Sequence, residues 1–162
     1  MDIYAYLDQH GIAYERVDHL PVYTCEQARE LVPELPGMEV KNLFLRDKKG
    51  RRHFLLVIDY DKNVDLKALS RLLDAPGLSM ASPERLVRHL AVEPGSVTML
   101  AVVNDEAGAV EVVVDAKVWA AERLRCHPLV NTATLSITRS DIERLFATTG
   151  HSAHVLEVPE RV

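Results

Sequence analysis

Runs of apolar residues separated by polar turns divide the chain into short strands and helices. Two such runs, residues 43–45 and residues 54–58, flank a basic tip that contains Gly50, and this pattern predicts a β-hairpin. The second run is apolar at five successive positions, so both faces of that strand should be covered by other elements. We therefore expect residues 54–58 to form a central strand of a sheet.

Helix signals recur on both sides of this hairpin. Residues 3–9 form a helical apolar pattern that ends before Gly11, and Thr24 and Gln27 have capping-box spacing for a helix through about residue 31. Ser82 followed by Pro83 places a cap and a first-turn proline in their preferred order. Three further helices are expected after Asp65, over residues 116–123, and from Thr138 to the residue before Gly150.

Strands are expected in the remaining apolar segments. Residues 14–18 alternate like a strand, and residues 99–103 and 110–114 predict a second hairpin across a turn. Two more strands should meet at Pro128 and continue to residue 137, and residues 155–158 should form a last strand. The sum predicts one α/β domain over residues 1–162, with a mixed, mainly antiparallel sheet surrounded by short helices.

Composition agrees with a single globular domain. The 162 residues are 48% hydrophobic and 27% charged, and a chain of this length buries roughly two-thirds of its unfolded surface. Apolar runs are too short to span a bilayer and the first residues lack a signal-peptide pattern, so we expect a soluble, cytoplasmic protein without membrane partners. Cys25 and Cys126 do not form a disulfide framework, and no Cys/His spacing indicates a metal site.

Charge is unevenly distributed along the chain. The net charge of -5 argues against nonspecific coating of nucleic acid. The tip of the first hairpin is nevertheless strongly basic, and its cationic residues are Arg46, Lys48, Lys49, Arg51 and Arg52. Two interpretations remain open for this tip, namely a local nucleic-acid footprint and a solvated turn kept soluble by its charge.

Standard catalytic signatures are missing, which leaves individual residues as candidates. The chain has no glycine-rich dinucleotide motif, P-loop, nucleophile elbow or His-Glu-x-x-His motif. Cys126 and His127 are neighbours in sequence, so on an extended strand they point to opposite faces and cannot form a dyad with each other. Lys41 precedes the first hairpin strand, and His127 stands at a strand end fixed by Pro128. For each of them an ordinary structural role is the alternative.

Several blocks of sequence resemble the YbaK/ProX editing-domain family, especially its freestanding alanyl-tRNA(Pro) deacylase branch. The two most specific blocks are Val40-Lys41-Asn42-Leu43-Phe44-Leu45 and His127-Pro128-Leu129-Val130-Asn131-Thr132-Ala133-Thr134. Further similar blocks lie at residues 64–67, 81–86 and 92–97, and the match is collinear over nearly the whole chain. The resemblance implies a YbaK-like fold and hydrolysis, in trans, of an amino acid wrongly esterified to tRNA(Pro), with alanine as the cargo. It implies no cofactor, tRNA as a partner, and prolyl-tRNA synthetase as a candidate partner.

The same resemblance assigns roles to particular residues. Lys41, Asn42 and His127 match functional positions of the family, and its Gly-x-x-x-Pro substrate loop falls on Gly95-Ser96-Val97-Thr98-Met99. Met99 replaces the family's proline, and Ala91 stands where a glycine is common. The cargo is therefore less defined than the reaction, and a deacylase for cysteinyl- or seryl-tRNA is an alternative, as is a noncatalytic tRNA- or synthetase-binding module.

An aminoacyl ester can be hydrolysed without a covalent nucleophile if water is held in attack geometry. We expect Lys41 and amide groups of the Gly95 loop to stabilise the oxyanion, and His127 to hold the substrate or polarise water. Asn42 and Asn131 would supply neutral hydrogen bonds, and a small pocket would exclude proline by size. Met99 either shapes this pocket or fills the core. Contacts to tRNA are expected from Lys48, Lys49, Arg51 and Arg52.

Overall fold

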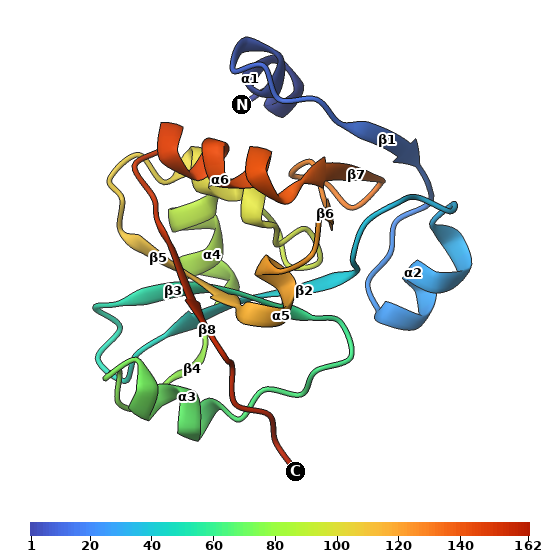
Figure 1. Cartoon of the computed structure of the whole chain (residues 1–162). Coiled ribbons are helices and arrows are strands. Elements are labelled where there is room, and N and C mark those ends of the chain that lie inside the picture. The colour runs from blue at the N-terminus through green and yellow to red at the C-terminus, as the bar shows by residue number, and fades with distance from the viewer.

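The computed structural model describes residues 1–162 apart from the side chains of Cys25 and Ala28. Its strands are β1 (Glu15–Asp18), β2 (Val40–Arg46), β3 (His53–Asp59), β4 (Ser79–Met80), β5 (Val110–Asp115), β6 (Arg123–Cys126), β7 (Ala133–Thr138) and β8 (Ala153–Leu156). Its helices are α1 (Ile3–Gln9), α2 (Cys25–Leu31), α3 (Leu66–Leu72), α4 (Pro83–Leu90), the 3-10 helix η1 (Met99–Asn104), α5 (Ala116–Trp119) and α6 (Arg139–Thr148). Figure 1 shows how these elements are arranged.

Two sheets form the framework. The larger sheet has the order β4-β2-β3-β5-β8, and the smaller has the order β1-β7-β6. Strand β2 pairs with β3 in antiparallel fashion, as the hairpin pattern predicts, whereas β3–β5 and β5–β8 are parallel. The expected α/β class with a mixed sheet and short helices is confirmed, and β3 is the middle strand of the larger sheet.

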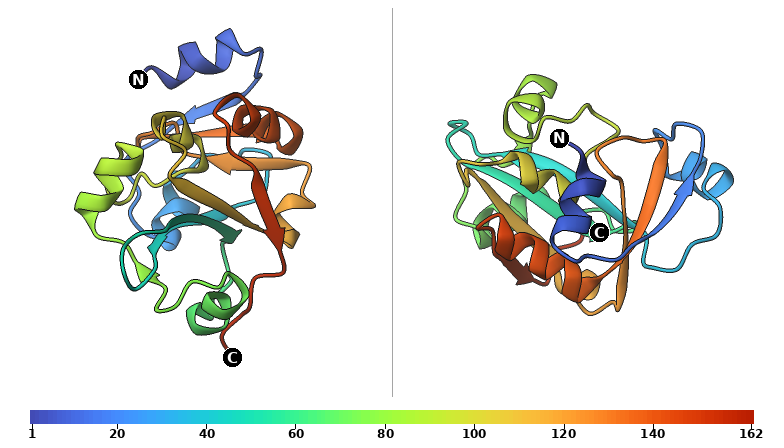
Figure 2. Two further views of the ribbon diagram at one scale, coloured as in Figure 1. Left: turned by 90° about the vertical axis from the view of Figure 1, so that its left-hand side faces the viewer. Right: turned by 90° about the horizontal axis from the view of Figure 1, so that it is seen from above.

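Both faces of β3 are buried, because successive side chains of a strand point to opposite sides. Leu55 and Val57 pack into the core between the two sheets, beside α4, η1 and α6. Leu56 and Ile58 pack into a second core on the other face, against α3. In Figures 1 and 2, α3 accordingly lies on the opposite side of the larger sheet from α1 and the smaller sheet. The continuous apolar run of β3 thus serves two cores at once.

The predicted helix caps are present. Asp65 Oδ1 accepts a hydrogen bond from Ala68 N at 3.0 Å, Ser82 Oγ from Arg85 N at 3.2 Å, and Thr138 Oγ1 from Asp141 N at 3.2 Å. Before α2, Thr24 Oγ1 accepts from Gln27 N as the capping box predicts, whereas Gln27 Oε1 accepts from Tyr23 N, one residue before the cap. Leu31 at the end of that helix is 36% exposed.

The expected strand over residues 99–103 is wrong, because this segment is the 3-10 helix η1. All five residues are at most 7% exposed, and periodicity cannot distinguish a short segment buried on every side as a helix from a buried strand. Thr98 begins the helix by accepting a hydrogen bond from Leu100 N at 3.3 Å. The predicted second hairpin is therefore absent, and β5 pairs in parallel with β3 instead.

Element boundaries differ modestly elsewhere. The helix expected over residues 116–123 ends at Trp119, and the last strand runs from Ala153 to Leu156 instead of over residues 155–158. Within the part of the chain that the structure describes, no helix combines the length and apolarity needed to cross a membrane.

Candidate functional site

The candidate site is a cavity of about 260 Å³ between the diverging edges of the two sheets. Met38 forms a parallel bridge with Leu124: its N–H donates to Arg123 O at 2.9 Å and its carbonyl accepts from Arg125 N at 3.1 Å. Beyond this bridge, β2 and β6 separate, and the cavity opens between them. Strand β4 pairs only with Leu45 and Arg46, so β4 leaves the first half of β2 uncovered.

Segments far apart in the sequence, between Val22 and Thr134, meet in this cavity. Its lining comes from the α2 region, β2, the segment after β3, the loop before η1, and the β6–β7 connection. The lining residues are Val22, Tyr23, Thr24, Val32, Glu39, Val40, Lys41, Asn42, Leu43, Tyr60, Gly95, Val97, Arg125, Cys126, His127 and Thr134.

The catalytic and substrate-binding residues predicted from sequence fall into two groups. Lys41, Asn42, Gly95, Val97 and His127 all line the cavity although they come from three distant segments. The remaining three lie around it: Asn131 donates from Nδ2 to Val22 O at 3.3 Å, Ser96 is 7% exposed, and Met99 is 1% exposed in the core between the sheets.

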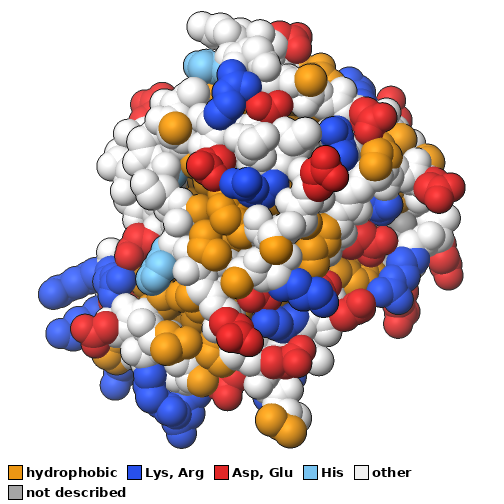
Figure 3. Space-filling view, in the orientation of Figure 1, with side chains coloured by type: hydrophobic (Ala, Val, Ile, Leu, Met, Phe, Trp, Pro, Cys, Tyr) orange, Lys and Arg blue, Asp and Glu red, His pale blue; other side chains and the backbone are white. Residues whose placement is uncertain are grey.

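The basic hairpin tip lies away from the cavity. Lys41 is the second residue of β2 and the basic tip follows the end of that strand, so about six residues of extended chain place them about 20 Å apart. Blue side chains gather over this tip and α3 at the lower left of Figure 3. Arg52 already binds both carboxylate oxygens of Glu111, at 3.0 and 2.9 Å, and the carbonyls of Leu73 and Asp74. A tRNA contact by Lys48, Lys49, Arg51 or Arg52 stays a prediction, and it would involve nucleotides remote from the ester.

Lys41 provides an uncompensated positive charge in the cavity. Its side chain is half-buried, and no carboxylate among the described residues lies within ion-pair distance of it. Its neighbour Asn42 has a buried Oδ1 without a hydrogen-bond partner in the same part of the chain. A buried polar atom left unpaired costs free energy, and such atoms are typical of sites completed by a ligand or water.

His127 is held as a neutral acceptor. Its Nδ1 lies 3.2 Å from the carbonyl oxygen of Ala133, which can only accept, so the proton of the neutral ring is on Nδ1 and Nε2 keeps a lone pair. Burial lowers the pKa of His127 below its ordinary value; the bond to Ala133 opposes this shift, and the nearby His19 adds slightly to it. His127 can therefore accept a proton or hydrogen bond from water near neutral pH.

Cys126 cannot serve as the nucleophile of this site. The thiol is buried, and burial raises its pKa to about 12, so it stays protonated near neutral pH. The side chain of Cys25 lies outside the described residues, so the sequence-based expectation about both cysteines is tested for Cys126 alone. Apart from the two side chains not described, the structure contains no group of His, Cys, Asp and Glu suited to a metal ion.

Sequence reasoning missed several lining residues. Glu39 Oε1 lies 3.3 Å from Arg125 Nη1, and Arg125 Nη2 donates to the carbonyl of Leu35. Tyr23 is 70% exposed as a residue, and its ring lies against Gly95, since a Cβ on that glycine would lie 3.2 Å from Tyr23 Cδ1. Thr134 Oγ1 is 2.8 Å from His19 Nε2. Thr134 ends the His127–Thr134 block, but Glu39, Arg125 and Tyr23 belong to no motif, so only the tertiary fold reveals that these residues converge.

Comparisons with known proteins agree with this arrangement. Residues 19–145 match the family model described as "Aminoacyl-tRNA editing domain". Over 156 residues the chain is 38% identical to "Prolyl-tRNA editing protein ProX" of Acetoanaerobium sticklandii, covering 96% of this chain and 95% of that protein. It is 37% identical over 153 residues to "Prolyl-tRNA synthetase associated domain-containing protein 1" of Danio rerio, covering 93% and 83%. A crystal structure described as a candidate trans-editing enzyme for prolyl-tRNA synthetase shares the fold, with a TM-score of 0.71, 23% identity, and 99% and 96% of the chains covered.

Proposed function

The chain belongs to the aminoacyl-tRNA editing domain family and is an aminoacyl-tRNA deacylase, and we propose that it acts in trans on tRNA(Pro) mischarged with alanine. The observation that carries this proposal is the meeting of Lys41 and a neutral His127 in one small cavity. The names of the relatives support tRNA(Pro) as the nucleic acid and prolyl-tRNA synthetase as a candidate partner.

In the proposed reaction, water attacks the ester carbonyl carbon. The carbonyl oxygen gains negative charge, which the ammonium group of Lys41 stabilises, while Nε2 of His127 accepts a proton from the attacking water. The C–O bond to the ribose then breaks, the ribose oxygen takes up the proton from Nε2 of His127, and the free amino acid and the tRNA hydroxyl are released. Ser96 N already donates to Glu93 O at 3.0 Å, so the amides of Gly95 and Val97 are the donors that the loop can offer to the oxyanion.

The cavity suits discrimination by size. Alanine carries one methyl group where proline carries a ring, and attraction alone separates such similar side chains by only 10- to 200-fold per methylene, or about 1–3 kcal/mol. A confined cavity can exclude the larger ring sterically. Because Met99 lies in the core beneath the loop, any effect it has on cargo would act through the position of Gly95 and Val97.

Single-turnover deacylation tests the proposed substrate. We expect alanyl-tRNA(Pro) to be hydrolysed at least about tenfold faster than prolyl-tRNA(Pro), because the proposal assigns discrimination to steric exclusion of the proline ring. Seryl- and cysteinyl-tRNA serve as further substrates in the same assay. Faster hydrolysis of either would support a deacylase whose cargo is serine or cysteine instead of alanine. Equal rates for the alanyl and prolyl esters would contradict discrimination by size.

The pH dependence tests the role of His127. Burial lowers the folded-state pKa of His127 below the ordinary value of histidine, so the ring is mostly neutral at pH 7 and protonates as the pH falls further. We expect the single-turnover rate to stay level from pH 8 to about 7 and to fall under more acidic conditions, once corrected for the spontaneous hydrolysis of the ester. His127→Ala should remove this acidic limb along with most activity. An unchanged limb in that variant would assign the titration to another group.

A further inference from the structure

Glu39 gives the cavity its one carboxylate among the lining side chains that the structure describes. It precedes Lys41 by two residues, and its side chain is 38% exposed. Nearby carboxylates outside the lining are already paired: Asp59 with Lys117 at 2.5 Å and Asp61 with Arg29 at 3.0 Å.

The position of Glu39 is set by Arg125. Arg125 Nη1 lies 3.3 Å from Glu39 Oε1, and Nη2 is fixed by the carbonyl of Leu35. Oε2 of Glu39 has no hydrogen-bond partner in the described part of the chain. The arrangement therefore presents one held oxygen and one available oxygen to the cavity.

An aminoacyl ester needs such a group. Its carbonyl carbon is bonded to a carbon that carries an ammonium group, and this charge would enter a cavity that already holds the cations of Lys41 and Arg125. Without a nearby anion, like-charge repulsion would oppose binding, because charges interact strongly in a partly buried site.

We infer that Glu39 binds the α-ammonium group of the esterified amino acid and thereby turns the ester carbonyl toward Lys41. This inference rests on the proposed deacylase function of the same cavity. Arg125 acts as a positioning residue for Glu39. The site then selects esters with a free α-amino group, so that peptidyl-tRNA and other N-acylated esters are poor substrates.

Binding of two stable adenosine analogues tests the inference independently of turnover. In 3′-(alanylamino)-3′-deoxyadenosine an amide replaces the ester, and 3′-(propionylamino)-3′-deoxyadenosine lacks only the ammonium group. We expect the wild-type protein to bind the alanyl compound at least about tenfold more tightly, as for a hydrogen bond to a charged group. In Glu39→Gln this preference should fall to about threefold or less.

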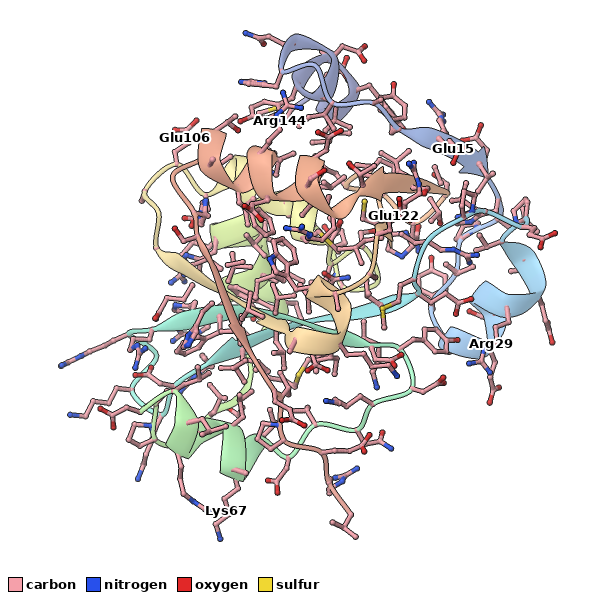
Figure 4. The ribbon with its side chains drawn as sticks, viewed as in Figure 1. Glu15, Arg29, Lys67, Glu106, Glu122 and Arg144 are labelled. Carbon is pink, nitrogen blue, oxygen red and sulfur yellow. The ribbon has the colours of Figure 1, made fainter. Side chains whose placement is uncertain are left out.

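A matched control is Glu15→Gln. Glu15 lies on β1, its carboxylate is 3.6 Å from Arg123 on β6, and it is not part of the cavity lining. Figure 4 labels Glu15. This variant should keep the wild-type preference. Equal binding of the two analogues by the wild-type protein, or an unchanged preference in Glu39→Gln, would overturn the inference.

Hydrolysis of alanyl-tRNA(Pro), measured beside binding, separates this inference from the proposed function. A Glu39-dependent preference without hydrolysis would support ammonium recognition and reject the alanyl substrate. Hydrolysis by the wild-type protein with no Glu39-dependent preference would support the substrate and reject the role of Glu39.

Discussion

Replacing Lys41 with alanine is expected to reduce single-turnover deacylation by about 10²- to 10³-fold, the usual effect of removing one oxyanion donor. The ammonium group lies in the cavity without a carboxylate partner among the described residues, so its charge remains available to the reacting ester. Because Lys41 makes no ion pair with a described carboxylate, the free energy of unfolding of the variant should lie within about 1 kcal/mol of the wild-type value.

The control for this variant is Lys67→Ala. Lys67 lies on α3, on the far side of the larger sheet from the smaller one, and is labelled at the bottom of Figure 4. The Lys67→Ala variant loses the same single positive charge, but at a position outside the cavity lining. Its single-turnover rate should therefore change by less than about twofold. Wild-type activity in Lys41→Ala would remove this residue from the mechanism, and an equal loss in both variants would indicate a general charge effect on tRNA binding.

The parts of the fold that sequence predicted correctly have local causes. Ser82 and Pro83 begin α4, and Asp65 caps α3, because a cap needs only residues within one helical turn. The apolar run of β3 is also a local signal, since a strand buried on both faces needs no alternation. Residues 99–103 lack such a signal, because their surroundings are apolar on every side and both structures satisfy that pattern.

The residues of the candidate site also divide into those that sequence could predict and those that it could not. Lys41 and His127 stand in blocks of sequence whose resemblance to a family is specific, and the structure brings both to one cavity. Glu39, Arg125 and Tyr23 could not be predicted, because each acquires its partner only when separate segments meet. Glu39 and Arg125, for example, come from opposite walls of the cavity and join only where the two sheets diverge.

A buried network outside the lining of that cavity holds the fold together. Asp105, directly after η1, accepts hydrogen bonds from Ala109 N at 3.1 Å and Val110 N at 2.8 Å. It also lies 2.8 Å from Nε2 of His151, whose Nδ1 is 2.7 Å from Thr149 Oγ1. A carboxylate only accepts, so Nε2 carries a proton that it donates to Asp105. The network ties the start of β5 to the segment after α6.

Replacing Asp105 with alanine is expected to lower the free energy of unfolding by about 3–5 kcal/mol. Both side chains of the Asp105–His151 pair are only 3% exposed, and two buried donors and one part-buried donor would lose their acceptor. Urea unfolding followed by circular dichroism measures this loss. Glu106→Ala is the control, since Glu106 is the exposed neighbour labelled in Figure 4 and should change stability by less than about 0.5 kcal/mol.

The same variant separates stability from chemistry. Asp105 and His151 do not line the cavity that holds Lys41 and His127, so the folded fraction of Asp105→Ala should retain a single-turnover rate within about threefold of the wild-type rate. Lys41→Ala should show the reverse, with lost activity and retained stability. A destabilisation of less than about 1 kcal/mol in Asp105→Ala would mean that water replaces the missing carboxylate. The network would then not be what holds the start of β5 to the segment after α6.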